Sequence, residues 1–245
     1  MKRLLAAGSG AIYELGRVFR QAEQGARHNP EFTMLEWYRP GFDHHQLMDE
    51  VEALLLAVGA RPQQQATKRC RYRDIVREHV NIDPLAASSK KLNELVNERG
   101  WFDGQLTREA SLDLILSLGV APEIKVGELL FIYDFPACQA ALAAIDPGDV
   151  RVAQRFEVFL GPVELANGYN ELCEPIELAA RFEAQNRGRI ADGKAAVPVD
   201  QLLIAATMHG IGSCAGVALG VDRLLMALAG EDSLQAVINF PWGRA

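Results

Sequence analysis

Hydrophobic and polar residues alternate in several short segments of the chain, a pattern typical of strands that bury one face. Residues 11–20 and 31–38 show this pattern near the N-terminus, and the polar loop between them contains Asn29-Pro30. The two segments therefore predict a long antiparallel hairpin. The same reasoning predicts later strands at residues 129–134, 155–160, 163–167 and 216–220.

A helical period follows the hairpin. Residues 46–58 place hydrophobic side chains at helical spacing and stop at Gly59, which predicts an amphipathic helix. Residues 61–126 are helical and charged in pattern, and we expect an insertion or accessory subdomain there. Strands scattered among helices predict an α+β fold with a mainly antiparallel sheet. Further helices are expected near residues 90–99, 108–118 (ended by Gly119), 178–189, 199–208 and 223–229.

Composition narrows the possible functions. The chain has 245 residues, with 25 Lys and Arg against 32 Asp and Glu, a formal net charge of −7. Because this charge repels a phosphate backbone, a broad nucleic-acid-binding face is not expected. The four cysteines are scattered without a CxxC pair, as in a reduced cytoplasmic protein. The N-terminal apolar run is too short for a signal peptide, and no segment approaches the ~20 apolar residues of a membrane span, so we expect a cytoplasmic protein without membrane contact.

Glu36 is a carboxylate on an otherwise apolar strand face. In a strand from 31 to 38, Phe32, Met34, Glu36 and Tyr38 point to the same side. Burying the carboxylate without compensation costs several kcal/mol, so a cationic partner or a ligand is expected beside it. A salt bridge within the core is the alternative.

A second hairpin is predicted by the segment RFEVFLGPVELANGYNEL. With residues 161–162 as a two-residue turn, Val158 would face Leu165, and Glu157 and Glu164 would lie diagonally on one face. Two such carboxylates repel each other unless a cation lies between them, and Mg²⁺ is normally held by one or two carboxylates together with phosphates. An acidic hairpin with a solvated outer face is the alternative.

Glu171 follows Glu164 by seven residues, an odd number that would aim it at the opposite face of the strand. One bulge at Asn167-Gly168 would return Glu171 to the face of Glu164.

Three small residues at alternate positions leave one face of a later strand almost without side chains. These are Gly216, Ala218 and Gly220, and such a run usually marks the close approach of a ligand or another backbone. Arg223 follows, and its guanidinium together with Phe32 could sandwich a flat ring. Tight packing of a helix on the strand is the alternative.

Cations also flank the loop of the first hairpin. Arg20 ends the first strand, and Arg27 and His28 precede the second. Such a group suits an anionic phosphate chain, and isolated surface charges are the alternative.

Together these residues resemble the signature of class II aminoacyl-tRNA synthetases, in particular the lysyl branch. Phe19-Arg20 and the run HNPEFTMLEWY at 28–38 resemble motif 2, and GVALGVDR at 216–223 resembles motif 3. The segment RFEVFLGPVELANGYNEL resembles the lysine-binding part of that branch. The resemblance covers nearly the whole chain and implies one class II catalytic domain over residues 1–245.

Within that branch the chain is most similar to the ligases that attach lysine or β-lysine to elongation factor P. We expect no anticodon-binding barrel before the core, and the similarity in sequence continues past motif 2 through HNPEFTMLEWYRP. Ala218 stands where lysyl-tRNA synthetases usually have glycine. The alanine methyl would narrow the pocket and favour β-lysine by shape. We expect the N-terminal motif 1 region to be lacking, a homodimer if that region is present, and no tRNA binding.

The resemblance also implies roles for individual residues. Arg20 would be the catalytic residue that holds the α-phosphate and the substrate carboxylate, and Glu157 and Glu164 would bind Mg²⁺. The ATP-binding residues would be Arg20, His28, Asn29, Phe32, Glu164, Leu165, Gly220 and Arg223. The substrate-binding residues would be Glu36, Tyr38, Asn167, Glu171 and Ala218.

The implied reaction forms an aminoacyl-adenylate from ATP and then transfers the acyl group to a lysine side chain of elongation factor P. A lysyl-tRNA synthetase fragment and a non-catalytic paralogue acting as a regulatory or binding subunit remain alternatives. One position departs from the motif, because Ala22 stands where the family has glutamate and the nearest acid is Glu23.

Overall fold

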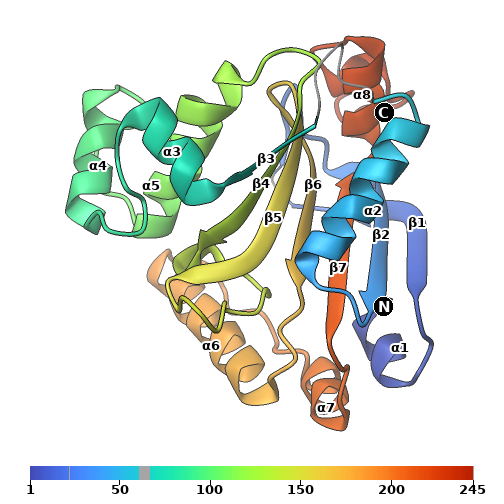
Figure 1. Ribbon diagram of the computed structural model, residues 1–245. Coiled ribbons are helices and arrows are strands. Elements are labelled where there is room, and N and C mark those ends of the chain that lie inside the picture. The colour runs from blue at the N-terminus through green and yellow to red at the C-terminus, as the bar shows by residue number, and fades with distance from the viewer. Residues whose placement is uncertain (22, 61–66, 245) are drawn as a thin grey trace.

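A seven-stranded sheet runs through the computed structural model, which describes residues 1–21, 23–60 and 67–244 (Figure 1). The strand order in these residues is β1-β2-β7-β6-β5-β4-β3, and every neighbouring pair is antiparallel except β3 with β4. The sheet confirms the predicted α+β class. The strands are β1 Ile12–Phe19, β2 Glu31–Pro40, β3 Lys68–Arg71, β4 Leu129–Pro136, β5 Val152–Leu160, β6 Val163–Asn170 and β7 Cys214–Gly220.

The predicted N-terminal hairpin and the helix after it are both present. β1 pairs with β2 from Ile12 opposite Tyr38 to Phe19 opposite Glu31. Helix α2, His44–Ala57, begins two residues before the predicted start because Asp43 and Gln46 form a capping box.

The remaining helices are α1 Lys2–Ala6, α3 Tyr72–Val80, α4 Ser89–Glu98, α5 Arg108–Leu114, α6 Pro175–Ala191, α7 Gln201–His209 and α8 Val221–Ala229. The helix α3 and the short strand β3 were not predicted. The prediction that Gly119 ends a helix is wrong, because a π-helix continues from Ile115 to Val120. Gly119 is needed there for packing, since a Cβ atom would lie 2.6 Å from Cη2 of Trp101.

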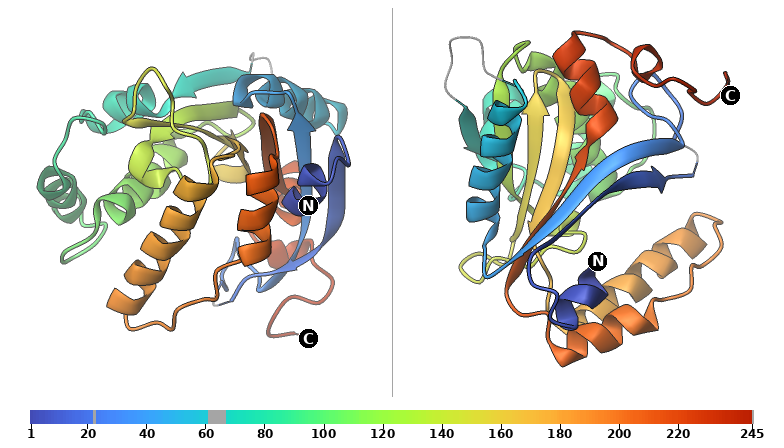
Figure 2. Two further views of the ribbon diagram at one scale, coloured as in Figure 1. Left: turned by 90° about the horizontal axis from the view of Figure 1, so that it is seen from below. Right: turned by 90° about the vertical axis from the view of Figure 1, so that its right-hand side faces the viewer.

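The two faces of the sheet are covered differently. On one face, Leu47 and Val51 of α2 pack against Trp37, Val158 and Val217 in the main hydrophobic core. Figure 2 shows α2 on one side of the sheet and α6 and α7 on the other.

On the opposite face, α3, α4 and α5 cover the part of the sheet formed by β4 and β5. Ile75, Leu92 and Leu112 of these helices share a cluster with Ile132 and Phe159 of the strands. The region expected to be a subdomain therefore packs on the sheet, its residues 61–66 lie outside the described part, and its independence stays a prediction. In the described residues, no helix is both long and apolar enough to cross a bilayer.

Candidate functional site

A cavity of about 140 Å³ lies on the sheet face opposite α2. It brings together all eight residues predicted to bind ATP, with Asn167 and Ala218 of the predicted substrate set. Residues from the β1–β2 hairpin, β6, β7 and α8 thus meet in one place although they are far apart in sequence.

Strand pairing places Glu36, one of the residues predicted to bind the substrate, next to this cavity. Ala218 lines the cavity and pairs with Glu36 on one side and Asn167 on the other, so their side chains share one face. The hydroxyl of Tyr38 donates a 2.5 Å hydrogen bond to Oε1 of Glu36. Burial and the carboxylates of Glu171 and Glu36 raise the pKa of Tyr38, so this hydroxyl keeps its proton and acts as a donor.

Glu171 lies beside the Tyr38 ring as well, and we call the group of Glu36, Tyr38 and Glu171 the acidic slot. A Cβ atom on Gly216 would lie 2.4 Å from Cε1 of Tyr38 and 2.6 Å from Oε1 of Glu171. Glycine is therefore required because the Tyr38 ring and the Glu171 carboxylate occupy the space of a side chain. Burial, more than any other cause, raises the pKa of Glu171, with a further contribution from Glu36. The two carboxylates converge on Tyr38, in agreement with what the resemblance implies.

The predicted bulge exists at a different position. Phe159 pairs with Glu164 but Val158 pairs with Ala166, so Leu165 is the extra residue and the predicted pairing of Val158 with Leu165 is wrong. The bulge lies here because the Leu165 side chain is buried in the core on the α2 side. It restores Glu171 to the face of Glu164, the role that we assigned to Asn167-Gly168.

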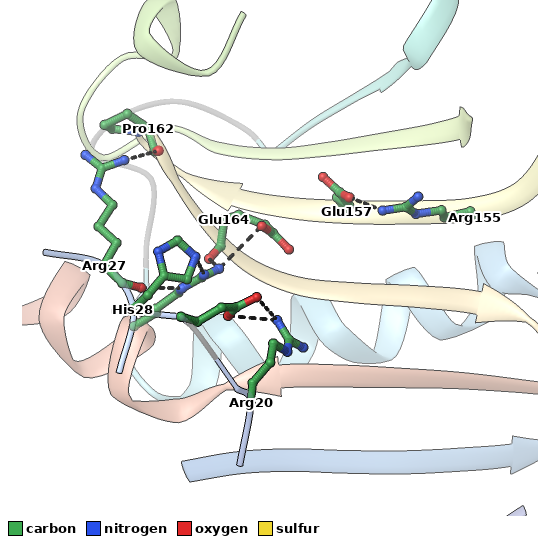
Figure 3. A network of polar contacts seen from close by, with 9 residues as sticks. Arg20, Arg27, His28, Arg155, Glu157, Pro162 and Glu164 are labelled. Carbon is green, nitrogen blue, oxygen red and sulfur yellow. Dashed lines mark hydrogen bonds and ion pairs between the residues drawn. The ribbon is translucent and has the colours of Figure 1, made fainter. Parts of the chain in front are cut away.

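Glu157 and Glu164 face one neighbouring cavity, and each is paired with an arginine (Figure 3). Glu157 forms an ion pair with Arg155, whose Nη1 also donates to the carbonyl of Gln139 at 2.6 Å. Desolvation and then the charge of Glu164 raise the pKa of Glu157 to about 8. Repulsion between the two carboxylates is what a cation between them would relieve.

The donor set at this position therefore fits the Mg²⁺ ion expected from the sequence. Glu157 and Glu164 supply oxygen ligands, and their cavity adjoins the groups predicted to bind the triphosphate. Their assignment to the ion stays a prediction.

Arg223 is at the centre of the polar network that closes the cavity. Its Nη1 lies 3.3 Å from Oε2 of Glu164, and its Nη2 lies 2.7 Å from Nε2 of His28. Burial and then the charge of Arg223 lower the pKa of His28, so a neutral imidazole accepts this bond. The residue stacked on the Phe32 ring is Arg20, whose Cζ lies 5.5 Å from the ring centroid.

Arg20 also pairs with Glu23, the acid next to the position where the motif departs. Its Nη1 lies 3.3 Å from Oε2 of Glu23, and both residues line the cavity. Ala22 itself is outside the described residues. Glu23 thus supplies a carboxylate to the arginine despite its displacement by one position in the sequence.

The side-chain amides of Asn29 and Asn167 form hydrogen bonds to other groups of the protein. Nδ2 of Asn29 donates to the carbonyl of Glu31 at 2.6 Å, and its Oδ1 accepts from the backbone NH of Trp242 at 2.8 Å. Nε of Arg155 lies 3.3 Å from Oδ1 of Asn167. Asn29 is therefore held rigidly at the cavity wall, and its predicted contact with the triphosphate stays a prediction.

Two charged residues at the site were missed by the sequence reasoning. Lys2 of α1 forms a 2.5 Å ion pair with Oε2 of Glu171, and Arg155 neutralises Glu157. Arg155 was detectable, because it stands two residues before Glu157 on the same face of a predicted strand. Lys2 offered no comparable signal, since it is separated from Glu171 by 169 positions.

Comparison with known proteins agrees with this geometry. A family model described as tRNA synthetases class II (D, K and N) matches residues 1–244. A Vibrio cholerae protein named elongation factor P--(R)-beta-lysine ligase is 48% identical over 100% of this chain and 76% of its own length. Proteins of the same name from Yersinia enterocolitica and Proteus mirabilis are 48% and 47% identical, each over 100% of this chain and 75% of their own length. The chain belongs to the class II tRNA synthetase family that comprises the D, K and N enzymes.

Proposed function

We propose that this protein activates lysine or (R)-β-lysine with ATP and transfers the acyl group to a lysine side chain of elongation factor P. The observation that carries the proposal is the acidic slot of Glu36, Tyr38 and Glu171, which begins at Ala218 beside the cavity of Arg20. A slot with two carboxylates and a hydroxyl suits an ammonium group, because an uncharged tail would leave carboxylates unpaired. The names of the most similar relatives support the same substrates.

In the first step, an oxygen of the substrate carboxylate attacks the α-phosphorus of ATP, and the bond to pyrophosphate breaks. Arg20 would stabilise charge on the α-phosphate, and its half-exposed guanidinium pairs with Glu23 and lies over the Phe32 ring. Phe32 and Arg223 would border the adenine, and Leu165 and Gly220, which line the same cavity, would lie next to it.

In the second step, a lysine amine of elongation factor P attacks the acyl carbon of the adenylate. An amide bond forms, AMP leaves and the amine loses one proton. Rate acceleration would come from positioning and electrostatics. Mg²⁺ held by Glu157 and Glu164 would supply charge neutralisation on the triphosphate.

The location and assembly follow as parts of the proposal. A protein that modifies a translation factor acts where translation occurs, in the cytoplasm. A homodimer is supported by the edge strand β1, on which Tyr13, Leu15 and Phe19 are largely exposed. The net charge of −7 argues against a large tRNA footprint.

The test is incubation of the protein with elongation factor P, ATP, Mg²⁺ and (R)-β-lysine, followed by intact-mass measurement. We expect one added β-lysyl group with the wild type and none with Arg20→Met. Charging of tRNA without modification of the factor would favour a lysyl-tRNA synthetase instead. Absence of amino-acid-dependent ATP–pyrophosphate exchange in folded protein would favour a regulatory subunit.

A further inference from the structure

The ion pair between Lys2 and Glu171 lies inside the proposed ammonium slot. Lys2 Nζ is 2.5 Å from Oε2 of Glu171 and 6.0 Å from the centroid of the Tyr38 ring. The Lys2 side chain is 19% exposed and that of Glu171 only 4%. A buried carboxylate thus has a cation supplied by the chain itself.

Helix α1 holds this lysine in place. Leu5 lies one turn after Lys2 and is buried in a cluster with Tyr38, Ile211 and Cys214. Because i and i+3 positions lie on the same side of a helix, the contact that buries Leu5 also directs Lys2 towards Glu171. Lys2 is therefore a fixed part of the slot wall.

The two oxygens of Glu171 are used differently. Lys2 contacts Oε2, whereas Oε1 lies above Gly216 next to Tyr38, whose hydroxyl binds Glu36. Glu171 can therefore keep its ion pair and still offer one oxygen to a substrate group. The formal charges of Glu36, Glu171 and Lys2 sum to one negative charge in the slot.

We infer that Lys2 is a positioning residue that keeps Glu171 ionised and leaves the slot with one net negative charge, so that it selects a substrate tail with a single ammonium group. The inference deepens the proposed function and rests on it. It assigns to Lys2 a part in substrate choice.

Loss of Lys2 would change the electrostatic charge of the slot. Without the cation, burial and the charge of Glu36 would favour the protonated form of Glu171. A protonated Glu171 would tolerate an uncharged tail, and an ammonium tail would have to displace that proton. Discrimination in favour of the ammonium would fall, and it would depend on pH.

Other groups that face Glu171 keep their protonation state through neutral pH. Burial raises the pKa values of Tyr38 on β2, Tyr169 on β6 and Cys173, and it raises the pKa of Cys214 on β7 to about 12. A change of discrimination between pH 6 and 8.5 therefore reports on the carboxylate pair.

The experiment compares Lys2→Met with Lys2→Arg, and with Arg3→Met as a control on the exposed side of the same helix. ATP–pyrophosphate exchange is measured from pH 6 to 8.5 with (R)-β-lysine and with an analogue that has a hydroxyl in place of the terminal amine. The readout is the ratio of the two kcat/KM values, which cancels effects on ATP and Mg²⁺ binding. Melting temperatures monitor folding.

We expect Lys2→Met to lower this ratio by about tenfold or more at pH 6, with recovery as the pH rises, because one pH unit below a raised pKa changes the ionised fraction about tenfold. Lys2→Arg and Arg3→Met should retain the wild-type ratio at every pH. A ratio in Lys2→Met that is unchanged, or that rises at every pH because a competing cation was removed, would overturn the inference. If the wild type itself shows no exchange with (R)-β-lysine, the proposed function fails instead.

Discussion

Single residues decide the shape of the amino-acid slot, and Gly216 is the clearest example. The positions of the Tyr38 ring and the Glu171 carboxylate leave no space for a Cβ atom there. At Gly220 the nearest atoms would be 3.8 Å from an added Cβ, which is ordinary contact. The same amino acid on the same strand thus serves two purposes.

We predict that Gly216→Ala destabilises the protein by about 1–3 kcal/mol through overpacking and raises the KM for (R)-β-lysine. The displaced groups, Tyr38 and Glu171, form the slot, so stability and substrate affinity should fall together. Denaturant unfolding and pyrophosphate exchange measure the two effects. Gly220→Ala is the stability control and should keep the wild-type free energy of unfolding. A Gly216→Ala protein with unchanged stability and KM would contradict the packing.

Arg155 is the second residue with a clear effect on stability, because its ion-pair partner Glu157 is only 6% exposed. We predict that Arg155→Met costs about 3–5 kcal/mol at pH 9, where Glu157 is ionised, the range seen when one partner of a buried ion pair is removed. The double variant Arg155→Met/Glu157→Gln should recover most of that loss, since no buried charge remains. Urea unfolding of the wild type and the two variants tests this, and equal destabilisation of the single and double variants would contradict the proposed ion pair.

The loss should also depend on pH. The folded pKa of Glu157, about 8, is above its value in the unfolded chain, so the folded state binds more protons and stability falls as the pH rises towards 8. Removal of Arg155 raises that pKa further and extends the fall to higher pH. The difference in unfolding free energy between wild type and Arg155→Met should therefore be larger at pH 9 than at pH 6. A constant difference would count against this explanation.

At the scale of elements, irregularities determine which side chains meet. The bulge at Leu165 brings Glu164, Asn167 and Glu171 to one face, and the π-helix at Ile115–Val120 continues past a glycine. Neither irregularity follows from local residue preferences.

For Gly119→Ala, helix propensity and packing predict changes in stability of opposite sign. Propensity alone predicts that Gly119→Ala stabilises a helix by about 1 kcal/mol. The structure predicts a loss of about 1–3 kcal/mol, because the added Cβ would lie 2.6 Å from Trp101 and 3.1 Å from Val80. Gly188→Ala is the matched control, since a Cβ inside α6 meets nothing within 4 Å and should stabilise. Thermal unfolding of both variants distinguishes the two predictions.

At the scale of the whole molecule, the sheet links its two hydrophobic clusters. β4 and β5 contribute Phe131 and Val158 to the cluster under α2, and Ile132 and Phe159 to the cluster under α3–α5. A strand that supplies side chains to both cannot unfold in one cluster alone.

We therefore predict a single cooperative unfolding transition for the protein. Trp101 lies beside the helical cluster and Trp37 in the main core, so variants that retain only Trp101 or only Trp37 of the three tryptophans report on each region. The two fluorescence transitions and the circular dichroism transition should coincide in urea. A separate, earlier transition at Trp101 would show that residues 61–126 form an independent subdomain.

Local pattern was sufficient to predict most of the fold. Alternating residues and helical spacing placed the β1–β2 hairpin, the later strands and α2 within a few residues, because burial of one face imposes a period on the sequence. The spacing of Gly216, Ala218 and Gly220 correctly indicated a strand face with almost no side chains. Alternation with one bulge returned Glu171 to the face of Glu164, and the resemblance implied that Glu36 and Glu171 belong to one site.

Tertiary structure decided the partners of those residues and the exact position of the bulge. Glu171 is paired with Lys2 and Glu157 with Arg155, while Arg20 rather than Arg223 lies over Phe32. Period along a strand determines which face a side chain occupies, and it carries no information on which distant element packs against that face. The charge of the slot depends on that packing, so only the three-dimensional arrangement determined it.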